Sequence, residues 1–300
     1  MSIPTLLILG SQGQVGWELQ RALAPLGTVV AWGRQQADLT RPDELARQIE
    51  TLAPALVINA AAYTAVDKAE SEADLAKAIN ADAPAAIARA ASRCGARLLH
   101  YSTDYVFSGD SDRPYGETDA TAPRSVYGAT KRAGEEGVLA ASGDHFVFRT
   151  EWVYGRHGGN FLKTILRLAR ERDSLRVVAD QFGAPTPAAL IADVTAHVAA
   201  RLLRDGAQAP AGGIYHLTAS GDTSWHGFAQ AIVSQAQTLG TELKLAADAI
   251  EAIPTSNYPL PAPRPANSRL DCSKLEGAFG LHLPAWHTLL PNILADILKP

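Results

Sequence analysis

The sequence has little of what would indicate a disulfide-stabilised, metal-binding or membrane protein. It has two cysteines, Cys94 and Cys272, with no CxxC pair and no histidine nearby at metal-ligand spacing, so neither a disulfide framework nor a zinc site is expected. The longest early apolar run, 5–9, is too short to span a membrane, and no positively charged segment precedes it as a secretory signal would require. We therefore expect a cytoplasmic protein without a metal.

A strong net charge is also missing. The formal charge of −4 offers no wide electrostatic attraction for nucleic acid or for an anionic membrane, so neither is expected as a partner. Apolar residues make up 47% and charged residues 19%, which is ordinary for a globular protein. A length of 300 residues suits one large domain or two unequal ones. A polyanionic substrate would need a locally basic pocket.

Short apolar segments alternate with longer amphipathic segments in the first half of the chain. The predicted strands are 6–9, 29–32, 56–59, 97–101 and 146–148, and the predicted helices are 15–26, 42–52, 75–93 and 125–141. Continuous apolar strands separated by helices indicate right-handed βαβ crossovers and a parallel sheet covered on both faces. The expected fold class is α/β, with a Rossmann-type doubly wound parallel sheet as a nucleotide-binding domain over 1–150.

The second half has a different character. Proline and turn residues cluster at 183–187, 209–213 and 254–265, and the last cluster is a long loop-like stretch of the kind often used for binding. We expect most of 151–300 to form a smaller C-terminal domain over the carboxyl edge of the sheet, although later segments can return to the sheet.

A glycine-rich segment, Gly10-Ser11-Gln12-Gly13-Gln14-Val15-Gly16, lies between the first predicted strand and the first predicted helix. Glycine permits a tight turn and the close approach of a pyrophosphate, which then sits on the helix N-terminus. The alternative is a glycine-rich turn without a ligand. The strand before it and the helix after it favour a dinucleotide site.

Candidate catalytic residues follow in the order that such a site needs. Tyr127 and Lys131 are four positions apart, which places them on one helical face. Tyrosine ordinarily ionises near pH ~10, so it needs a nearby ammonium to serve as an acid–base group. Thr103 follows the fourth strand, where it can donate a hydrogen bond to a substrate carbonyl, and 59–62 offers small residues beside a cofactor. Taken singly, these could be a surface pair, a loop cap and a turn; their order favours an active site.

Long stretches of the chain resemble the extended short-chain dehydrogenase/reductase superfamily and, more narrowly, its family of dTDP-4-dehydrorhamnose reductases. The glycine spacing GxxGxxG is that of the superfamily, and the matching stretches are 13–19, 59–70, 101–107, 126–128, 152–154, 180–186 and 264–270. The resemblance implies NADPH-dependent reduction of the 4-keto group of dTDP-4-dehydro-6-deoxy-L-mannose to dTDP-L-rhamnose. It also implies that 1–150 binds NADPH and that 151–300 mostly binds the dTDP-sugar substrate.

The resemblance implies roles for individual residues. Tyr127 would donate the proton, Lys131 would lower its pKa and bind ribose, and Thr103 would tune the carbonyl. The expected cofactor-binding residues are Gly10, Ser11, Gln12, Gly13, Gln14, Val15, Gly16, Arg34, Asp38, Leu39, Ala61, Ala62, Tyr63, Thr64, Tyr127 and Lys131, and the expected substrate-binding residues are Val66, Thr103, Asp104, Trp152 and Arg264.

Two of these substrate residues have structural alternatives. Trp152 beside Val153 and Tyr154 is also typical of a core position. Arg264 is a diphosphate partner by the bidentate geometry of its guanidinium, or else a solvated loop cation.

The residues after the second predicted strand favour NADPH over NADH, which stays an alternative. An acidic residue at this point accepts hydrogen bonds from the ribose of NADH and repels a 2′-phosphate. This sequence has Gly33 there, and Arg34 follows, which can pair the 2′-phosphate. The alternative for Arg34 is a solvated surface cation.

The sequence departs from the family pattern at one proposed metal position. Some relatives bind magnesium at a dimer interface through three carboxylates, and Glu18 and Asp296 match two of them, while the third position is Ala189. Two oxygen ligands are few for a hard cation, so magnesium is not expected to be essential. A monomer and a homodimer both stay open.

Two other functions remain to be separated from the reductase. One is a nucleotide-sugar dehydratase or epimerase of the same fold, and the other is a non-catalytic NADP-binding regulatory subunit. Related dehydratases carry an acid directly after the Thr-Asp pair, where this chain has Tyr105, a weak acid at neutral pH. The presence of Tyr127, Lys131 and Thr103 favours an enzyme over a regulatory subunit.

Overall fold

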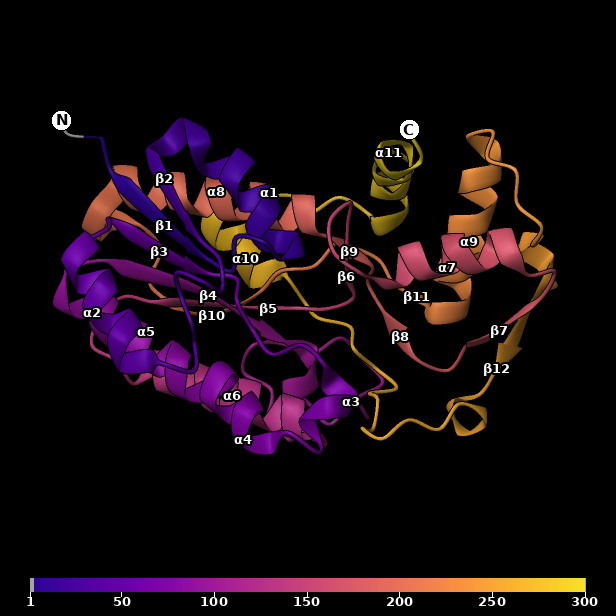
Figure 1. The fold of residues 1–300 in the computed structure, drawn as a ribbon, viewed down its shortest axis with the longest axis horizontal. Coiled ribbons are helices and arrows are strands. Elements are labelled where there is room, and N and C mark those ends of the chain that lie inside the picture. The colour runs from indigo at the N-terminus through magenta and orange to yellow at the C-terminus, as the bar shows by residue number, and fades with distance from the viewer. Residues whose placement is uncertain (1–2, 300) are drawn as a thin grey trace.

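The structure is a computed structural model and describes residues 3–299. A six-stranded parallel sheet forms its centre (Figure 1). The strands lie in the order β10-β5-β4-β3-β1-β2. Their bounds are β1 Thr5–Leu9, β2 Thr28–Trp32, β3 Leu56–Asn59, β4 Arg97–Thr103, β5 Phe146–Thr150 and β10 Gly213–His216. Each pair of neighbours is parallel, which confirms the predicted doubly wound α/β class.

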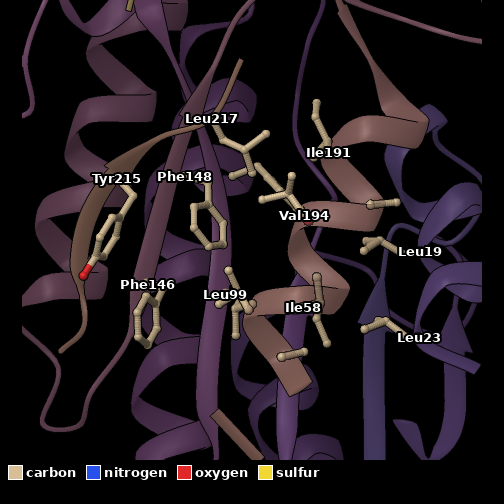
Figure 2. Close-up of a cluster of buried hydrophobic side chains, with 14 of the residues drawn as sticks. Leu19, Leu23, Ile58, Leu99, Phe146, Phe148, Ile191, Val194, Tyr215 and Leu217 are labelled. Atoms are coloured by element: carbon tan, nitrogen blue, oxygen red, sulfur yellow. The ribbon is translucent and has the colours of Figure 1, made fainter. Parts of the chain in front are cut away.

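Helices cover both faces of this sheet. One face carries α2 Pro42–Leu52, α5 Ala83–Arg93 and α6 Val126–Leu139, and the other carries α1 Gln14–Leu23, α8 Ala188–Asp205 and α10 Ser273–Phe279. Successive residues of β1 alternate between these faces, so Leu6 joins one core and Leu7 the other. Figure 2 shows the core beneath α1 and α8, where Val194 of α8 lies between Phe148 of β5 and Leu19 of α1. A strand buried on both sides needs a continuous apolar run, which is why the pattern was readable.

Two predicted helices differ from the observed ones. The helix expected over 75–93 is divided into α4 Ala73–Lys77, a π turn over Ala78–Asp82, and α5. The helix expected over 15–26 ends as an α-helix at Leu23 and continues as a 3₁₀ turn over Ala24–Leu26. Pro25 has no N–H group to donate to the α-helical ladder, so the helix tightens there.

Several late segments return to the sheet. Strand β10 pairs with β5 in parallel, from Gly213 opposite Phe146 to His216 opposite Arg149. Helix α8 packs against α1, and both contribute side chains to one core. The sheet is therefore completed by chain that lies beyond residue 187.

The remaining C-terminal segments have a core of their own and lie beside the carboxyl ends of the strands (Figure 1). They comprise α7 Phe161–Glu171, β7 Leu175–Val178, α9 Trp225–Thr238, β12 Ile250–Ile253 and α11 Trp286–Leu298. Short elements connect the two parts, namely α3 Val66–Ala69, β6 Val153–Tyr154, β8 Phe182–Gly183, β9 Thr186–Pro187 and β11 Thr223–Ser224. Within residues 3–299 no helix is both long enough and apolar enough to span a membrane.

Candidate active site

A cleft of about 620 Å³ lies at the carboxyl ends of β1, β3 and β4. The strand order reverses between β1 and β3, and ligands of open α/β sheets bind at such a point. All the expected cofactor residues except Ser11 and Gly16 line the cleft: Gly10, Gln12, Gly13, Gln14, Val15, Arg34, Asp38, Leu39, Ala61, Ala62, Tyr63, Thr64, Tyr127 and Lys131. A wider surface hollow of about 1320 Å³ outside α2 shares Gln12, Arg34 and Asp38 with the cleft but contains none of the catalytic candidates.

The glycine loop is shaped by close main-chain approach. Gly10 has a φ of 82°, and a Cβ atom there would lie 2.7 Å from the Ala61 nitrogen. At Gly16 a Cβ atom would lie 2.1 Å from the Gly10 carbonyl oxygen. Helix α1 begins after Gly13 with no side-chain cap and no acidic residue in its first turn. Its N–H groups are thus left for an anion, and the loop fits a dinucleotide pyrophosphate.

Arg34 and Asp38 lie on the rim of the cleft after β2. Arg34 is exposed and forms no salt bridge with any residue between 3 and 299. The Asp38 carboxylate accepts hydrogen bonds from the Thr40 nitrogen at 2.9 Å and the Thr40 hydroxyl at 2.7 Å. These bonds lower the pKa of Asp38. The negative charge of Asp38 is therefore stabilised by a residue of the same turn, Thr40.

Asn80, in the middle of the π turn, fixes part of the cofactor loop. Its Oδ1 accepts a hydrogen bond from the Tyr63 nitrogen at 2.8 Å, and its Nδ2 donates to the Tyr63 carbonyl oxygen at 3.0 Å. The Asn80 side chain is fully buried. The Tyr63 hydroxyl donates to Glu72 at 2.5 Å, which raises the pKa of Tyr63 to about 12. Asn80 was not among the predicted site residues, because no sequence motif marks a π turn.

Tyr127, in the first turn of α6, reaches the cleft beside the end of β4. Burial raises the pKa of Tyr127 to about 12, while the Thr103 hydroxyl acts in the opposite direction. Thr103 donates to Asp104 Oδ1 at 3.0 Å and accepts from the Tyr105 nitrogen at 3.2 Å. Burial also raises the pKa of Asp104, to about 6. For Thr103 to donate to a substrate carbonyl as expected, its hydroxyl has to rotate away from Asp104.

Lys131 lies one turn after Tyr127 and is 2% exposed. Its Nζ donates to the Tyr101 carbonyl oxygen at 2.6 Å and lies 3.4 Å from His100 Nε2. Burial lowers the pKa of Lys131 to about 8. The next carboxylate along the helix, Glu135, is engaged by Arg149 through bonds of 2.9 and 2.6 Å. Lys131 therefore has no salt-bridge partner in the described part of the chain.

Trp152 directly follows β5 and Glu151, with a φ of 45° that a bulky side chain rarely adopts. Its half-buried ring stacks on Trp225, with centroids 3.6 Å apart and planes at 13°. A Cβ atom at Gly183 would lie 2.7 Å from Trp152 Cε2. Phe161 packs on Trp225 in turn, at 4.6 Å between centroids. Trp225 was not among the predicted site residues, because an isolated tryptophan carries no motif.

The other expected substrate residues meet at α3. Val66 begins this helix, and the carboxylate of Asp67 accepts from Arg264 Nη2 at 2.7 Å and from the Ala262 nitrogen at 3.2 Å. Arg264 is thus tied to α3, with a side chain that is 16% exposed. None of the five expected substrate residues lines the 620 Å³ cleft, although Ser102, which precedes Thr103 in the chain, does line it.

Comparison with known proteins places the chain in a family. A family model described as the RmlD substrate binding domain matches residues 4–299. The dTDP-4-dehydrorhamnose reductase of Burkholderia thailandensis is 51% identical over 295 residues, covering 98% of this chain and 99% of the relative. The dTDP-4-dehydrorhamnose reductase of Escherichia coli K12 is 48% identical over 297 residues, covering 97% of each. The chain belongs to the dTDP-4-dehydrorhamnose reductase family.

Solved structures of the family share the fold along the whole chain. A dTDP-4-dehydrorhamnose reductase of Bacillus anthracis in complex with NADP superposes with a TM-score of 0.88 at 34% identity, covering 99% of this chain and 100% of that one. A Clostridium acetobutylicum relative gives 0.89 at 34% identity, covering 98% and 100%. The predicted family is therefore confirmed.

Of the three positions compared with the magnesium ligands of some relatives, two carry a carboxylate in this chain, Glu18 and Asp296. Glu18 on α1 lies 3.6 Å from Arg21, and Asp296 on α11 lies 3.6 Å from Lys299, so each pairs with a basic residue three positions along the chain. Ala189 stands at the start of α8. Among residues 3–299 no group of three or more His, Cys, Asp or Glu side chains is placed to hold a metal ion.

Proposed function

We propose that this chain reduces the 4-keto group of dTDP-4-dehydro-6-deoxy-L-mannose with NADPH to give dTDP-L-rhamnose. The observation that carries the proposal is that Tyr127 and Lys131 line the same cleft as the glycine loop, in a chain whose relatives are dTDP-4-dehydrorhamnose reductases. This reduction would be the last step of dTDP-L-rhamnose synthesis. We propose that it takes place in the cytoplasm.

The cleft fits NADPH, and the Bacillus anthracis relative was solved in complex with NADP. The glycine loop and the N-terminus of α1 would hold the pyrophosphate. Arg34, exposed on the rim, would pair the 2′-phosphate through its planar guanidinium. When bound, NADPH supplies the hydride that is added to C4 of the sugar.

Tyr127 would donate a proton to the oxygen that the hydride addition leaves negative. A phenol whose pKa is raised to about 12 stays protonated at neutral pH, so it is ready to donate. The phenolate left behind is stabilised by the charge of a protonated Lys131. Thr103 would hold the carbonyl oxygen once its hydroxyl turns from Asp104.

The sugar nucleotide would lie between the sheet and the C-terminal segments, so that 1–150 mainly binds NADPH and 151–300 mainly binds substrate. The stacked ring of Trp152 would cover the sugar together with Val66 and Asp104. Arg264, held by Asp67, would face the diphosphate, where a guanidinium pairs two oxygens at once.

One assay tests this function against its alternatives. We expect NADPH absorbance at 340 nm to fall when the protein meets dTDP-4-dehydro-6-deoxy-L-mannose, and to fall more slowly with other 4-keto-6-deoxy nucleotide sugars. Incubation with dTDP-glucose and NAD should yield no 4-keto product, because burial raises the pKa of Tyr105 and removes it as an acid. A dehydration product would favour the dehydratase, and NADPH binding without turnover would favour the regulatory subunit.

A further inference from the structure

His100 lies in β4 between two buried polar side chains. Its Nδ1 is 3.1 Å from Asn59 Nδ2, and its Nε2 is 3.4 Å from Lys131 Nζ. Asn59 and His100 are fully buried, and Lys131 is 2% exposed. The three side chains therefore form a continuous polar chain from β3 through β4 to α6.

The main chain determines how this chain of hydrogen bonds is directed. The Ala61 N–H group donates to Asn59 Oδ1 at 3.1 Å, so the oxygen of that amide is fixed and its Nδ2 must be the group that faces His100. An amide nitrogen is only a donor, so His100 Nδ1 accepts. A neutral imidazole that accepts at Nδ1 carries its proton on Nε2. Burial lowers the pKa of His100 well below its ordinary value and outweighs the Asn59 main chain, which raises it, so the ring is neutral at physiological pH whichever form Lys131 takes.

The Nε2–H group of His100 consequently points toward Nζ of Lys131. An ammonium offers only donors, whereas a neutral amine has a lone pair that can accept from Nε2–H while it donates to the Tyr101 carbonyl oxygen. The titratable groups that face Nζ are His100 from β4 and Glu135 from α6, and Glu135 is bonded to Arg149 from β5. The Tyr101 phenol bonds to Thr195 instead. Burial lowers the pKa of Lys131 and Glu135 raises it, but the Glu135 carboxylate is bonded to Arg149, so burial and the facing Nε2–H group favour the uncharged amine.

We propose that His100 is a positioning residue that favours the neutral amine form of Lys131, and that binding of NADPH makes the neutral fraction of Lys131 take up a proton from solvent. The inference rests on the proposed function, since it requires NADPH in the cleft. The phosphates of NADPH bring negative charge, and the ribose hydroxyls offer acceptors, so both favour an ammonium. The lowered pKa of Lys131, about 8, agrees with a charge that is easily lost.

Isothermal titration calorimetry with NADPH tests the proton uptake directly. At pH 8.0, in buffers with different heats of ionisation, the wild-type protein should take up about half a proton, since a group with a pKa of about 8 is half neutral there. The 2′-phosphate, with a second pKa near ~6, does not contribute at this pH. Binding without uptake would overturn the inference. Absence of binding would instead overturn the proposed cofactor.

Variants assign the proton to its residue. Lys131→Met should abolish the uptake, and persistent uptake would mean that another group titrates. His100→Asn keeps an acceptor for Asn59 but removes the N–H that faces Nζ, so uptake at pH 8.0 should fall toward zero. The matched control is His197→Gln, in which a part-buried histidine of α8 is replaced and uptake should stay as in the wild type.

The pH dependence of affinity separates positioning from a merely structural role. Above pH 8 the wild-type Kd for NADPH should rise by up to about tenfold per pH unit, because the amine must be protonated to bind. In His100→Asn the Kd for NADPH should stay constant to about one pH unit higher than in the wild type. A structural defect would instead weaken binding equally at every pH. If His100→Asn does not fold, nitrogen NMR of the wild-type ring decides: an Nδ1–H with a bare Nε2 would overturn the proposal.

Discussion

The two halves of the proposed active site are held together in different ways. On the cofactor side the main chain defines the shape, since Gly10 and Gly16 lie against backbone atoms with no room for a Cβ. On the sugar side, pairs of side chains from distant segments hold each other, as Trp152 does with Trp225 and Arg264 with Asp67. Backbone atoms cannot easily move away from an added side-chain atom. When one side chain of a pair is removed, the other side chain is still present. Changes to the main-chain contacts of the cofactor side should therefore have larger effects than changes to the side-chain pairs of the sugar side.

The largest effect is expected at Tyr127, which stands between the two halves. Tyr127→Phe keeps the ring but removes the proton donor, so kcat should fall by roughly 10²–10⁴-fold, the usual scale of acid–base catalysis. The Kd for NADPH and the circular dichroism spectrum should be unchanged. Near-full activity would mean that another group is the acid.

Gly16→Ala tests the main-chain side. The added Cβ would meet the Gly10 carbonyl oxygen at 2.1 Å, and overpacking of about 1–3 kcal/mol should raise the Kd for NADPH by roughly five- to 150-fold. The matched control is Gly277→Ala in α10, where an added Cβ meets nothing within 4 Å. Fluorescence titration with NADPH would measure both, and equal affinities would contradict the comparison.

Trp225→Ala tests the side-chain pairs. Loss of an aromatic stack worth about 0.5–1.5 kcal/mol should raise the KM for the sugar nucleotide by about two- to tenfold, with kcat and NADPH affinity kept. Trp225→Phe should recover most of the loss, because a ring remains to support Trp152. A fall in kcat alone would place Trp225 outside substrate positioning.

Arg34→Ala should have a smaller effect, limited to coenzyme choice. An exposed ion pair contributes about 0.2–1 kcal/mol, so kcat/KM with NADPH should fall by up to about fivefold and kcat/KM with NADH should not change. Arg167→Ala, on the exposed face of α7, serves as the control. An unchanged NADPH-to-NADH ratio in Arg34→Ala would show that this residue does not bind the 2′-phosphate.

Neither half is expected to need a metal ion. With Ala189 at the third carboxylate position, EDTA should leave the rate nearly unchanged. Loss of activity that magnesium alone restores would contradict this expectation.

The same difference decides what could be predicted from sequence. The strands were predictable because burial on both faces requires unbroken apolar runs, and the glycine loop because its constraint lies within a few consecutive residues. The π turn at Asn80 was not, since its hydrogen bonds go to Tyr63 rather than to sequence neighbours. Trp225 and His100 were missed for the same reason: their partners are fixed by tertiary contacts that no local pattern encodes.

The position of β10 at one edge of the sheet sets an order for biosynthesis. A ribosome that has released residues 1–150 has delivered five strands, but the apolar face of β4 and β5 still lacks α8, β10 and α10. That face carries Phe146, Phe148 and Leu99, all fully buried in the finished chain. At roughly 5–20 residues per second, it waits several seconds for its cover. During that interval the face is exposed apolar surface of the kind that promotes aggregation, and an engineered fragment that stops at residue 150 would keep it exposed.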